Sequence, residues 1–288
     1  MKFDKFLSPF GHDKLMEALA KISHVALDMD GTIYLGSTLF PYTQHFLETL
    51  RRLDISYSFL TNNPTKSSGD YLEKLRKLGI EATAEQMYTS SIATVDYIHQ
   101  NYPQAKRIFA LGTPSMQEEF RKGGFELCED SPEDRPDVLV AAFDTTLTYS
   151  RLCRAAWWAS HKDIPYIATN PDWVCPTDQQ TILVDCGSLC KAIEGATKRQ
   201  PDVVIGKPNP NMLWCIRDKY GLKDDEIAMV GDRIYTDVAT AQNAGSFGVL
   251  VLSGETTLEV SQTYERQPDL TAASIKELGE LLEEARGH

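Results

Sequence analysis

Strand and helix patterns alternate along nearly the whole chain, and this alternation constrains the fold more than any other feature of the sequence. Apolar residues at helical spacing, such as Leu47, Leu50 and Leu53, separate most of the short apolar runs that predict strands. Those runs lie at 24–27, 56–60, 107–111, 137–143, 165–168, 203–205, 227–230 and 248–252. The pattern is typical of βαβ units, so the sequence predicts an α/β fold built on a parallel sheet.

The chain is long enough for more than one hydrophobic core, because its 288 residues exceed the size of most single domains. Two segments interrupt the alternation, at 79–85 and at 170–187. They predict an inserted α/β domain of about 100 residues, an ordinary domain size. We therefore expect a catalytic core formed by 1–83 and 184–288, and an inserted smaller domain formed by 84–183.

Composition and charge exclude several classes of partner. The 29 basic residues are outnumbered by 41 acidic ones, giving a formal net charge of -12, and no basic run stands out. Nucleic acid and anionic membrane partners are therefore not expected. No segment approaches the roughly 18 apolar residues that span a bilayer, the N-terminus does not resemble a signal peptide, and the six cysteines include no CxxC pair. We expect a cytoplasmic protein with free thiols; a homo-oligomer is left open.

The strongest local signal is Asp28-Met29-Asp30-Gly31-Thr32 at the end of the first predicted strand. Side chains alternate along a strand, so Asp28 and Asp30 are expected to face the same way. Two carboxylates on one face repel unless a cation or a proton lies between them. Gly31 allows the chain to turn away sharply. An Asx turn that merely closes a strand is the simpler alternative for Asp30 and Gly31.

Three other predicted strands also end in polar residues. A hydroxyl and two amides, Thr61, Asn62 and Asn63, follow the second strand, and such groups suit a phosphate. A later strand is followed by Lys207, whose ammonium is a compact charge for a phosphoryl oxygen. Taken singly, the segment from Thr61 to Asn63 fits an ordinary turn, and Lys207 fits a solvated lysine of a loop.

The fourth of these strands ends in Gly231-Asp232, and Asp237 follows it closely. Taken alone, this pair of residues fits a helix cap. Ligands of open parallel sheets bind beyond the carboxyl ends of the strands, however, and all four polar segments fall at such ends. Folding would therefore gather them at one edge of the sheet, which favours a single phosphate site over four unrelated turns.

These four segments, in this order, resemble the four motifs of the haloacid dehalogenase superfamily of phosphohydrolases, over residues 24–254. In that family the first motif reads DxDx[TV], which residues 28–32 match. The resemblance implies a Rossmann-like parallel core with an inserted smaller α/β cap domain. It also implies a phosphatase acting on a small phosphate ester.

The layout is similar to the branch that contains N-acetylglucosamine-phosphate, 4-nitrophenyl-phosphate and pyridoxal-phosphate phosphatases, which carry a type C2 cap. Residues 31–40 are too few for a cap after the first motif, whereas the long segment 61–207 has an α/β pattern of its own. The segment 185–188 departs from the Gly-rich form expected there, which bears on the substrate and not on the chemistry. The resemblance places specificity in a cap loop that holds Asn170, Asp172 and Asp185.

The family mechanism assigns a role to each core residue. Asp28 would be the nucleophile that forms an aspartyl-phosphate, and Asp30 the general acid and base. Mg²⁺ would be held by Asp28, the backbone carbonyl of Asp30, and Asp232. For Asp237 direct binding, orientation of a metal water and a capping role are all open, and we favour an indirect role. The phosphoryl group would be held by Thr61, Asn62, Asn63 and Lys207.

Other functions compete with this one. A dehalogenase or phosphonate-cleaving relative is disfavoured because an acid at Asp30 suits phosphate-ester cleavage. A P-type ATPase core would need membrane helices. A receiver-like signalling module would show adjacent acids on its first strand and no inserted domain, and would not turn over. An inactive carbohydrate-phosphate binding protein would not need the complete set of acids.

Overall fold

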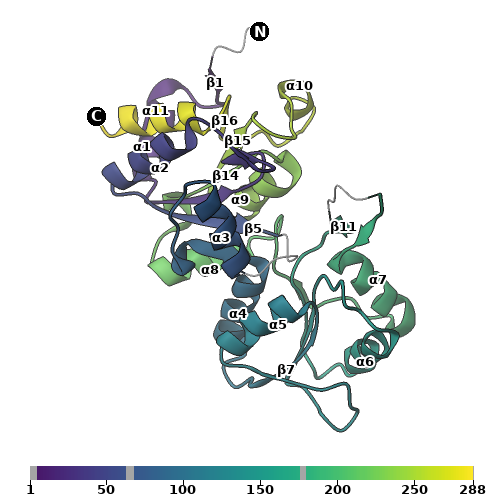
Figure 1. The fold of residues 1–288 in the computed structure, drawn as a ribbon. Helices are drawn as coiled ribbons and strands as arrows, with labels where there is room; N and C mark the ends of the chain where they lie inside the picture. The colour runs from purple at the N-terminus through teal and green to yellow at the C-terminus, as the bar shows by residue number, and fades with distance from the viewer. Residues whose placement is uncertain (1–4, 63–67, 176–179, 288) are drawn as a thin grey trace. The chain divides into compact units, whose positions relative to one another are not determined.

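The computed structural model describes residues 5–62, 68–175 and 180–287. Its contacts divide the chain into two compact units (Figure 1). The first unit comprises Met1–Thr61, Leu72–Tyr88 and Lys207–His288, and the second comprises Asn62–Tyr71 and Thr89–Gly206. The chain thus enters and leaves the second unit in the manner of an insertion.

A seven-stranded sheet forms the centre of the first unit, with the order β1-β16-β15-β14-β2-β5-β6. The strands from β16 to β5 are parallel to one another, and β1 is antiparallel to β16. The three central strands are buried along most of their length because helices cover both faces. The strand bounds are β1 Phe6–Leu7, β2 His24–Asp28, β5 Ser56–Thr61, β6 Met87–Thr89, β14 Ile227–Gly231, β15 Phe247–Val251 and β16 Leu270–Ala272.

Helices of this unit connect successive strands. The packed groups are α1 with α11, α11 with α2, and α8 with α9. Their bounds are α1 His12–Lys21, α2 Thr43–Arg52, α3 Ser68–Lys77, α8 Asn211–Tyr220, α9 Ala239–Ala244, α10 Leu258–Ser261 and α11 Ile275–Ala285. Shorter elements are the hairpin β3 Tyr34–Leu35 and β4 Thr38–Leu39, and the helical turns η1 Ala84–Gln86, η2 Asp224–Glu226 and η3 Ile234–Val238. Helix α3 contributes its first residues to the second unit and the rest to the first.

The order of the strands reverses between β2 and β14. From β2 the chain continues through α2 to β5 on one side, and from β14 it continues through α9 to β15 on the other. Parallel crossovers are right-handed, so α2 and α9 leave these adjacent strands toward opposite faces of the sheet. The carboxyl ends of β2 and β14 are therefore the position at which ligands of open α/β sheets bind.

The second unit is built on its own parallel sheet of five strands, ordered β13-β10-β9-β7-β8. A separate antiparallel pair joins β11 to β12. The strand bounds are β7 Arg107–Leu111, β8 Glu126–Leu127, β9 Val138–Ala141, β10 Tyr166–Ala168, β11 Val174–Cys175, β12 Leu183–Val184 and β13 Val203–Val204. The helices are α4 Ser90–Asn101, α5 Pro114–Lys122, α6 Tyr149–Ala159 and α7 Cys186–Thr197.

The boundaries of the units differ from those expected for the inserted domain. The second unit comprises Asn62–Tyr71 and Thr89–Gly206, whereas 84–183 was expected for the inserted domain. Helix α7 accounts for most of the later C-terminal boundary, because its buried residues Leu189 and Ile193 pack in one apolar cluster with Trp158 of α6 and Tyr166 of β10. Periodicity identifies such a helix but does not reveal which of two sheets it covers.

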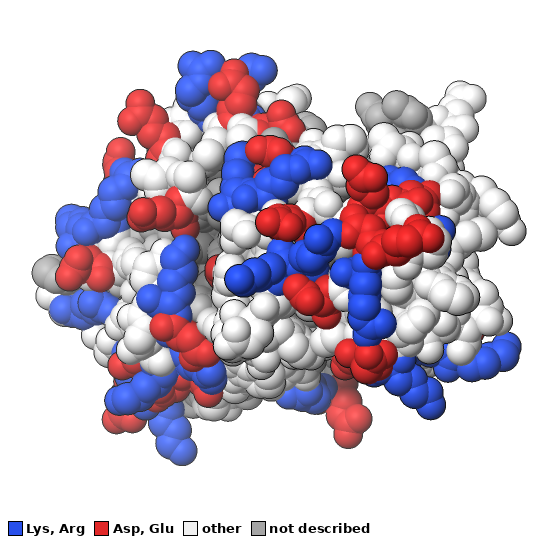
Figure 2. Space-filling model, turned by 90° about the horizontal axis from the view of Figure 1, so that it is seen from below, with Lys and Arg blue, Asp and Glu red and all other residues white. Residues whose placement is uncertain are grey.

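Basic and acidic side chains are interleaved over much of the face that Figure 2 shows, with no broad basic area. None of the helices in the described ranges is long and apolar enough to cross a membrane. The six cysteines are all free thiols, four of them buried.

Candidate active site

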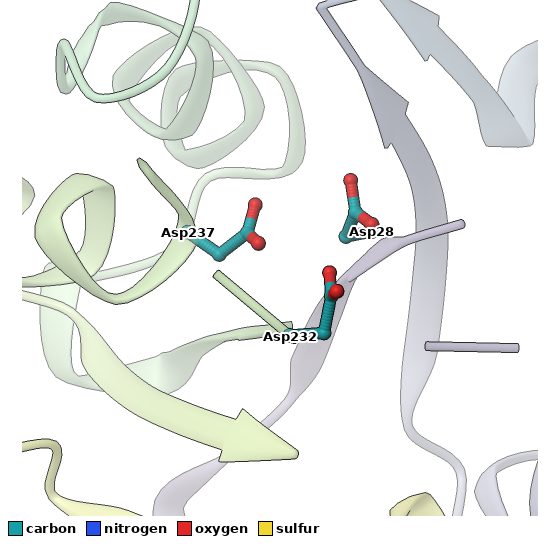
Figure 3. A group of neighbouring side chains, drawn as sticks. All are labelled: Asp28, Asp232 and Asp237. Carbon is teal, nitrogen blue, oxygen red and sulfur yellow. The ribbon is translucent and has the colours of Figure 1, made fainter. Parts of the chain in front are cut away.

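Three carboxylates meet beyond the strand ends where the sheet order reverses (Figure 3). Asp28 is the last residue of β2, Asp232 follows β14, and Asp237 lies in the helical turn η3. Strands β2 and β14 are paired in parallel, so their carboxyl ends lie side by side. One oxygen from each of the three side chains lies within 4.8 Å of the other two.

Lys207 lies among these acids. Its Nζ is 2.5 Å from Oδ1 of Asp28 and 2.6 Å from Oδ1 of Asp237, and its side chain is only 5% exposed. Burial alone would lower the pKa of Lys207, but the carboxylates of Asp237 and Asp28 outweigh burial and raise it. Burial raises the pKa of Asp28 to about 7, with Lys207 opposing this effect and Asp237 adding to it. The three acids therefore outnumber the one lysine ammonium that lies among them.

Three glycines allow the acids to approach the backbone. A Cβ on Gly254 would lie 2.1 Å from Oδ2 of Asp232, and a Cβ on Gly31 would lie 2.4 Å from the same oxygen. A Cβ on Gly231 would lie 2.2 Å from Cγ of Asp237. Gly31 also has a φ of 86°, in the left-handed region that favours glycine. Any side chain at these three positions would displace a carboxylate.

The hydrogen bonds of Asp232 leave one of its oxygens available. Oδ2 accepts from the backbone N–H of Glu255 at 2.7 Å, and the main-chain carbonyl accepts from Thr256 N–H at 3.1 Å. Oδ1 is buried and has no hydrogen-bond partner among the residues that the structure describes. A buried carboxylate oxygen without a donor is costly unless a cation binds it. The all-carboxylate set and this free oxygen fit Mg²⁺, which prefers oxygen ligands.

Asp30 lies outside this group of three carboxylates. Strand β2 ends at Asp28, so the alternation that was expected to direct Asp28 and Asp30 alike does not extend to Asp30. Asp30 instead forms an isolated bridge with Tyr34, and its Oδ1 accepts from the N–H of Gly36 at 3.3 Å. It is exposed at the start of the loop that leads to the β3–β4 hairpin.

The residues expected to hold phosphate are divided between the two units. Thr61 is the buried last residue of β5, the strand that pairs with β2 on the side away from β14. Asn62 belongs to the second unit, where its Nδ2 donates to Oδ2 of Asp172 at 3.2 Å. Asn63 lies outside the described residues.

The three residues expected to form a polar specificity loop are hydrogen-bonded to one another. Nδ2 of Asn170 donates to Oδ2 of Asp172 at 2.9 Å and to Oδ1 of Asp185 at 3.1 Å. Asn170 is fully buried and Asp185 is 2% exposed, whereas Asp172 is half-buried. Asp185 is the N-cap of α7, and burial raises its pKa to about 6. Of the three, Asp172 has the most accessible side chain.

Sequence reasoning overlooked the segment that follows β15. Ser253 donates its hydroxyl to the carbonyl of Gly31 at 2.7 Å, and Glu255 and Thr256 hold Asp232 as described above. The same segment supplies Gly254, which lies against Asp232. Its Ser-Gly-Glu-Thr composition indicates only a turn after a strand, so the sequence carries no signal for this role.

Two stretches of the chain match known families of hydrolases. Residues 25–126 match the family of haloacid dehalogenase-like hydrolases, and residues 204–278 match the HAD-hydrolase-like family. The two stretches together include Asp28, Lys207, Asp232 and Asp237. The interval between them falls within the second unit.

The similar proteins and structures include several phosphatases. The chain is 31% identical to an acid sugar phosphatase of Staphylococcus aureus, over 90% of this chain and 96% of that protein. It is also 31% identical to a chloroplastic phosphoglycolate phosphatase of Arabidopsis thaliana, over 87% of this chain and 74% of that protein. The crystal structure of 4-nitrophenylphosphatase from Thermotoga maritima is 40% identical, covers 91% of this chain and 98% of its own, and superposes with a TM-score of 0.83.

NagD from Escherichia coli is more distant in sequence, at 26% identity, but still superposes with a TM-score of 0.79 over 89% of this chain and 98% of its own. The parallel core sheet and the separate inserted sheet agree with this likeness. The chain therefore belongs to the haloacid dehalogenase-like hydrolases, as a phosphatase of the branch that contains NagD and 4-nitrophenyl phosphatase and carries a type C2 cap.

Proposed function

We propose that this chain is a Mg²⁺-dependent phosphomonoesterase that hydrolyses small phosphorylated metabolites through an aspartyl-phosphate on Asp28. The observation that carries the proposal is the cluster of Asp28, Lys207, Asp232 and Asp237 at the reversal point of the sheet. The names of the similar proteins, which include sugar, phosphoglycolate and 4-nitrophenyl phosphatases, support a small phosphate ester as substrate.

Asp28 acts as the nucleophile in this proposal. One of its oxygens attacks phosphorus, the bond from phosphorus to the ester oxygen breaks, and the phosphoryl group remains on Asp28 as an acyl phosphate. A water molecule then attacks the same phosphorus and releases phosphate and free Asp28. The side chain of Asp28 is 16% exposed, so it is accessible to a substrate while most of its surroundings exclude water.

Asp28, the backbone carbonyl of Asp30, and Asp232 would hold the magnesium ion. Bound there, the ion would reduce the repulsion between the carboxylate of Asp28 and an anionic phosphate. Asp237 serves differently, because its Oδ1 accepts from Lys207 and its Oδ2 accepts from the N–H of Arg233 at 3.1 Å. We assign Asp237 the indirect role of fixing Lys207.

Lys207 and Thr61 hold the phosphoryl oxygens in this scheme. The ammonium of Lys207 supplies the local positive charge that a protein with a net charge of -12 needs in order to bind an anion. Thr61 supplies a hydroxyl at the end of β5, beside β2. We retain Asn62 and Asn63 as further phosphate ligands within the proposal.

Asp30 is the proton donor to the leaving oxygen, and afterwards the base that activates water. Its exposed carboxyl, separate from the metal-binding carboxylates, suits a group that exchanges protons with a substrate. The second unit acts as the cap and selects the leaving group, mainly through the half-buried Asp172. Asn170 and Asp185 support that residue through the hydrogen bonds between Asn170 and both acids.

Turnover of 4-nitrophenyl phosphate with Mg²⁺ tests the proposal, together with trapping of the phosphoenzyme. Rapid acid quenching of the wild type with ³²P-labelled substrate should yield labelled protein, and hydroxylamine should release the label, as expected of an acyl phosphate. Asp28→Asn should lose both label and turnover, by several orders of magnitude, because an amide is a poor nucleophile. Asp13→Asn, on the exposed face of α1, is the matched control and should behave as wild type. Normal turnover by Asp28→Asn would refute the mechanism.

A further inference from the structure

A lysine of α3 lies over an aromatic ring beside the proposed acid. The ammonium of Lys74 is 3.9 Å from the centroid of the Tyr34 ring. Tyr34 is 2% exposed and Lys74 is half-buried, so the pair is largely shielded from water. Cation–π attraction is stronger when the cation is desolvated. The pair therefore connects α3 firmly to the loop that leads to the β3–β4 hairpin.

Tyr34 in turn fixes the backbone on both sides of Asp30. Its carbonyl accepts from the N–H of Gly31 at 2.7 Å, and its own N–H donates to the carbonyl of Met29 at 3.4 Å. Asp30 itself forms an isolated β-bridge with Tyr34. The residues immediately before and after Asp30 are thus both hydrogen-bonded to Tyr34, and a shift of Tyr34 would turn the Asp30 peptide.

Within the described ranges, the side chain of Asp30 has little support of its own. Its Oδ1 accepts a hydrogen bond from the N–H of Gly36 at 3.3 Å, at an exposed position. The direction of this carboxyl consequently depends on the backbone that Tyr34 holds. Such indirect support is effective, because displacing a catalytic group by about 1 Å can cost two orders of magnitude in rate.

We propose that Lys74 is a positioning residue of the reaction, which acts through the Tyr34 ring to hold Asp30 where it protonates the leaving oxygen. The inference rests on the proposed role of Asp30 as general acid. It assigns to α3 a part in catalysis that neither the motifs nor the carboxylate cluster indicates.

The identity of the leaving group distinguishes this role from general structural support. An alkoxide is a strong base and needs a proton as its bond to phosphorus breaks, whereas 4-nitrophenolate is a weak base that leaves without one. A misplaced general acid therefore slows alkyl phosphates and spares 4-nitrophenyl phosphate. A loosened fold, or a damaged metal site, slows both esters equally.

The experiment compares kcat and kcat/KM on 4-nitrophenyl phosphate and on glycerol phosphate, for wild type, Lys74→Met and Lys74→Arg. For Lys74→Met we expect a loss of about tenfold in kcat on glycerol phosphate and less than about twofold on 4-nitrophenyl phosphate, since general acid catalysis contributes about 10²–10⁴ in all. Lys74→Arg keeps a cation for the ring and should restore most of the loss. Lys77→Met, on the same helix with a 70% exposed side chain, is the control and should leave both esters unchanged.

Two further variants keep the outcome decisive. Tyr34→Leu removes the aromatic face and should match Lys74→Met. Asp30→Asn reports on the proposed function itself and should lose far more rate on glycerol phosphate than on 4-nitrophenyl phosphate. If Asp30→Asn is selective but Lys74→Met slows both esters equally or neither, the positioning role is wrong and the acid role stands. If Asp30→Asn affects both esters equally, the acid role is wrong as well.

Discussion

Asp232 and Asp237 lie close together, but their oxygens are engaged differently, and exchanging each for asparagine separates their roles. Oδ2 of Asp232 accepts from Glu255 N–H, and its Oδ1 has no donor in the described part of the chain. An asparagine has one acceptor and one NH₂ group. If its oxygen keeps the bond to Glu255, the NH₂ group faces the metal position and cannot bind a cation. If the amide is flipped, its oxygen faces the metal position, but the NH₂ group then faces the N–H of Glu255, which loses its acceptor. In both orientations the negative charge that favours the cation is lost.

The same exchange at Asp237 has another effect. Both oxygens of Asp237 are acceptors, one for Lys207 and the other for Arg233 N–H. An asparagine can satisfy only one of these donors, so the hold on Lys207 weakens. A hydrogen bond to a charged group contributes about 1.5–3 kcal/mol, which corresponds to about 10–100-fold in rate at about 1.4 kcal/mol per tenfold change.

We therefore expect Asp232→Asn to raise the Mg²⁺ concentration for half-maximal activity by more than about 100-fold, since even outer-sphere partners cost about 10–100-fold in metal affinity. Asp237→Asn should raise it far less and should mainly lower kcat/KM, because Asp237 holds Lys207 and not the ion. Initial rates across a Mg²⁺ titration measure the Mg²⁺ concentration for half-maximal activity. The Mg²⁺-dependent rise in melting temperature measures binding without turnover. Equal shifts in the two variants would refute the separate roles of Asp232 and Asp237.

Three further predictions follow from other parts of the structure. Gly254→Ala should mimic the loss of Asp232 in the Mg²⁺ titration, while Gly195→Ala, which has no close neighbours, should not. Burial and Lys219 lower the pKa of His24 to about 4 from 6.5, so the unfolded chain takes up the proton at a higher pH than the folded one. The free energy of unfolding should therefore fall by up to about 3 kcal/mol as the pH drops from 6.5 to about 4. Urea unfolding of His24→Asn should lack this dependence of stability on pH. Asp172→Ala should change kcat/KM unevenly among phosphate esters, whereas Lys207→Ala should lower it by a similar factor for all; a uniform loss in Asp172→Ala would place specificity elsewhere.

The sequence correctly indicated the parallel sheet and most of the polar residues beyond the carboxyl ends of its strands, and the reason is physical. Parallel strands are all covered on both faces, so they appear as short apolar runs, and their carboxyl ends share one edge. Asp28 and Asp232 follow paired strands of one sheet, so their positions relative to those runs were enough to predict their meeting. Lys207 instead follows β13, which belongs to the five-stranded sheet of the second unit, so a shared sheet edge does not explain its place beside them. The sequence also indicated that Asp237 belongs near them.

Other parts of the site depend on contacts that leave no local pattern. The bond from Ser253 to Gly31 joins residues 222 positions apart. The cation–π pair of Lys74 with Tyr34 is equally invisible to periodicity, and so is the hydrogen-bonded group that includes Asn170. Asn170 was expected in a polar specificity loop, and the structure buries it fully, with its amide donating to two carboxylates.

The glycines at the site have a consequence for how such enzymes are recognised. At Gly31, Gly231 and Gly254, the acids occupy the volume that a methyl group would fill. A relative could retain every aspartate and the lysine, satisfy any search for those residues, and still be inactive because one of these three positions had gained a single carbon atom. Loss of the enzyme during evolution would then leave its familiar motifs intact. To distinguish working members of this family from silent ones, one must examine the empty positions beside the carboxylates as closely as the carboxylates themselves.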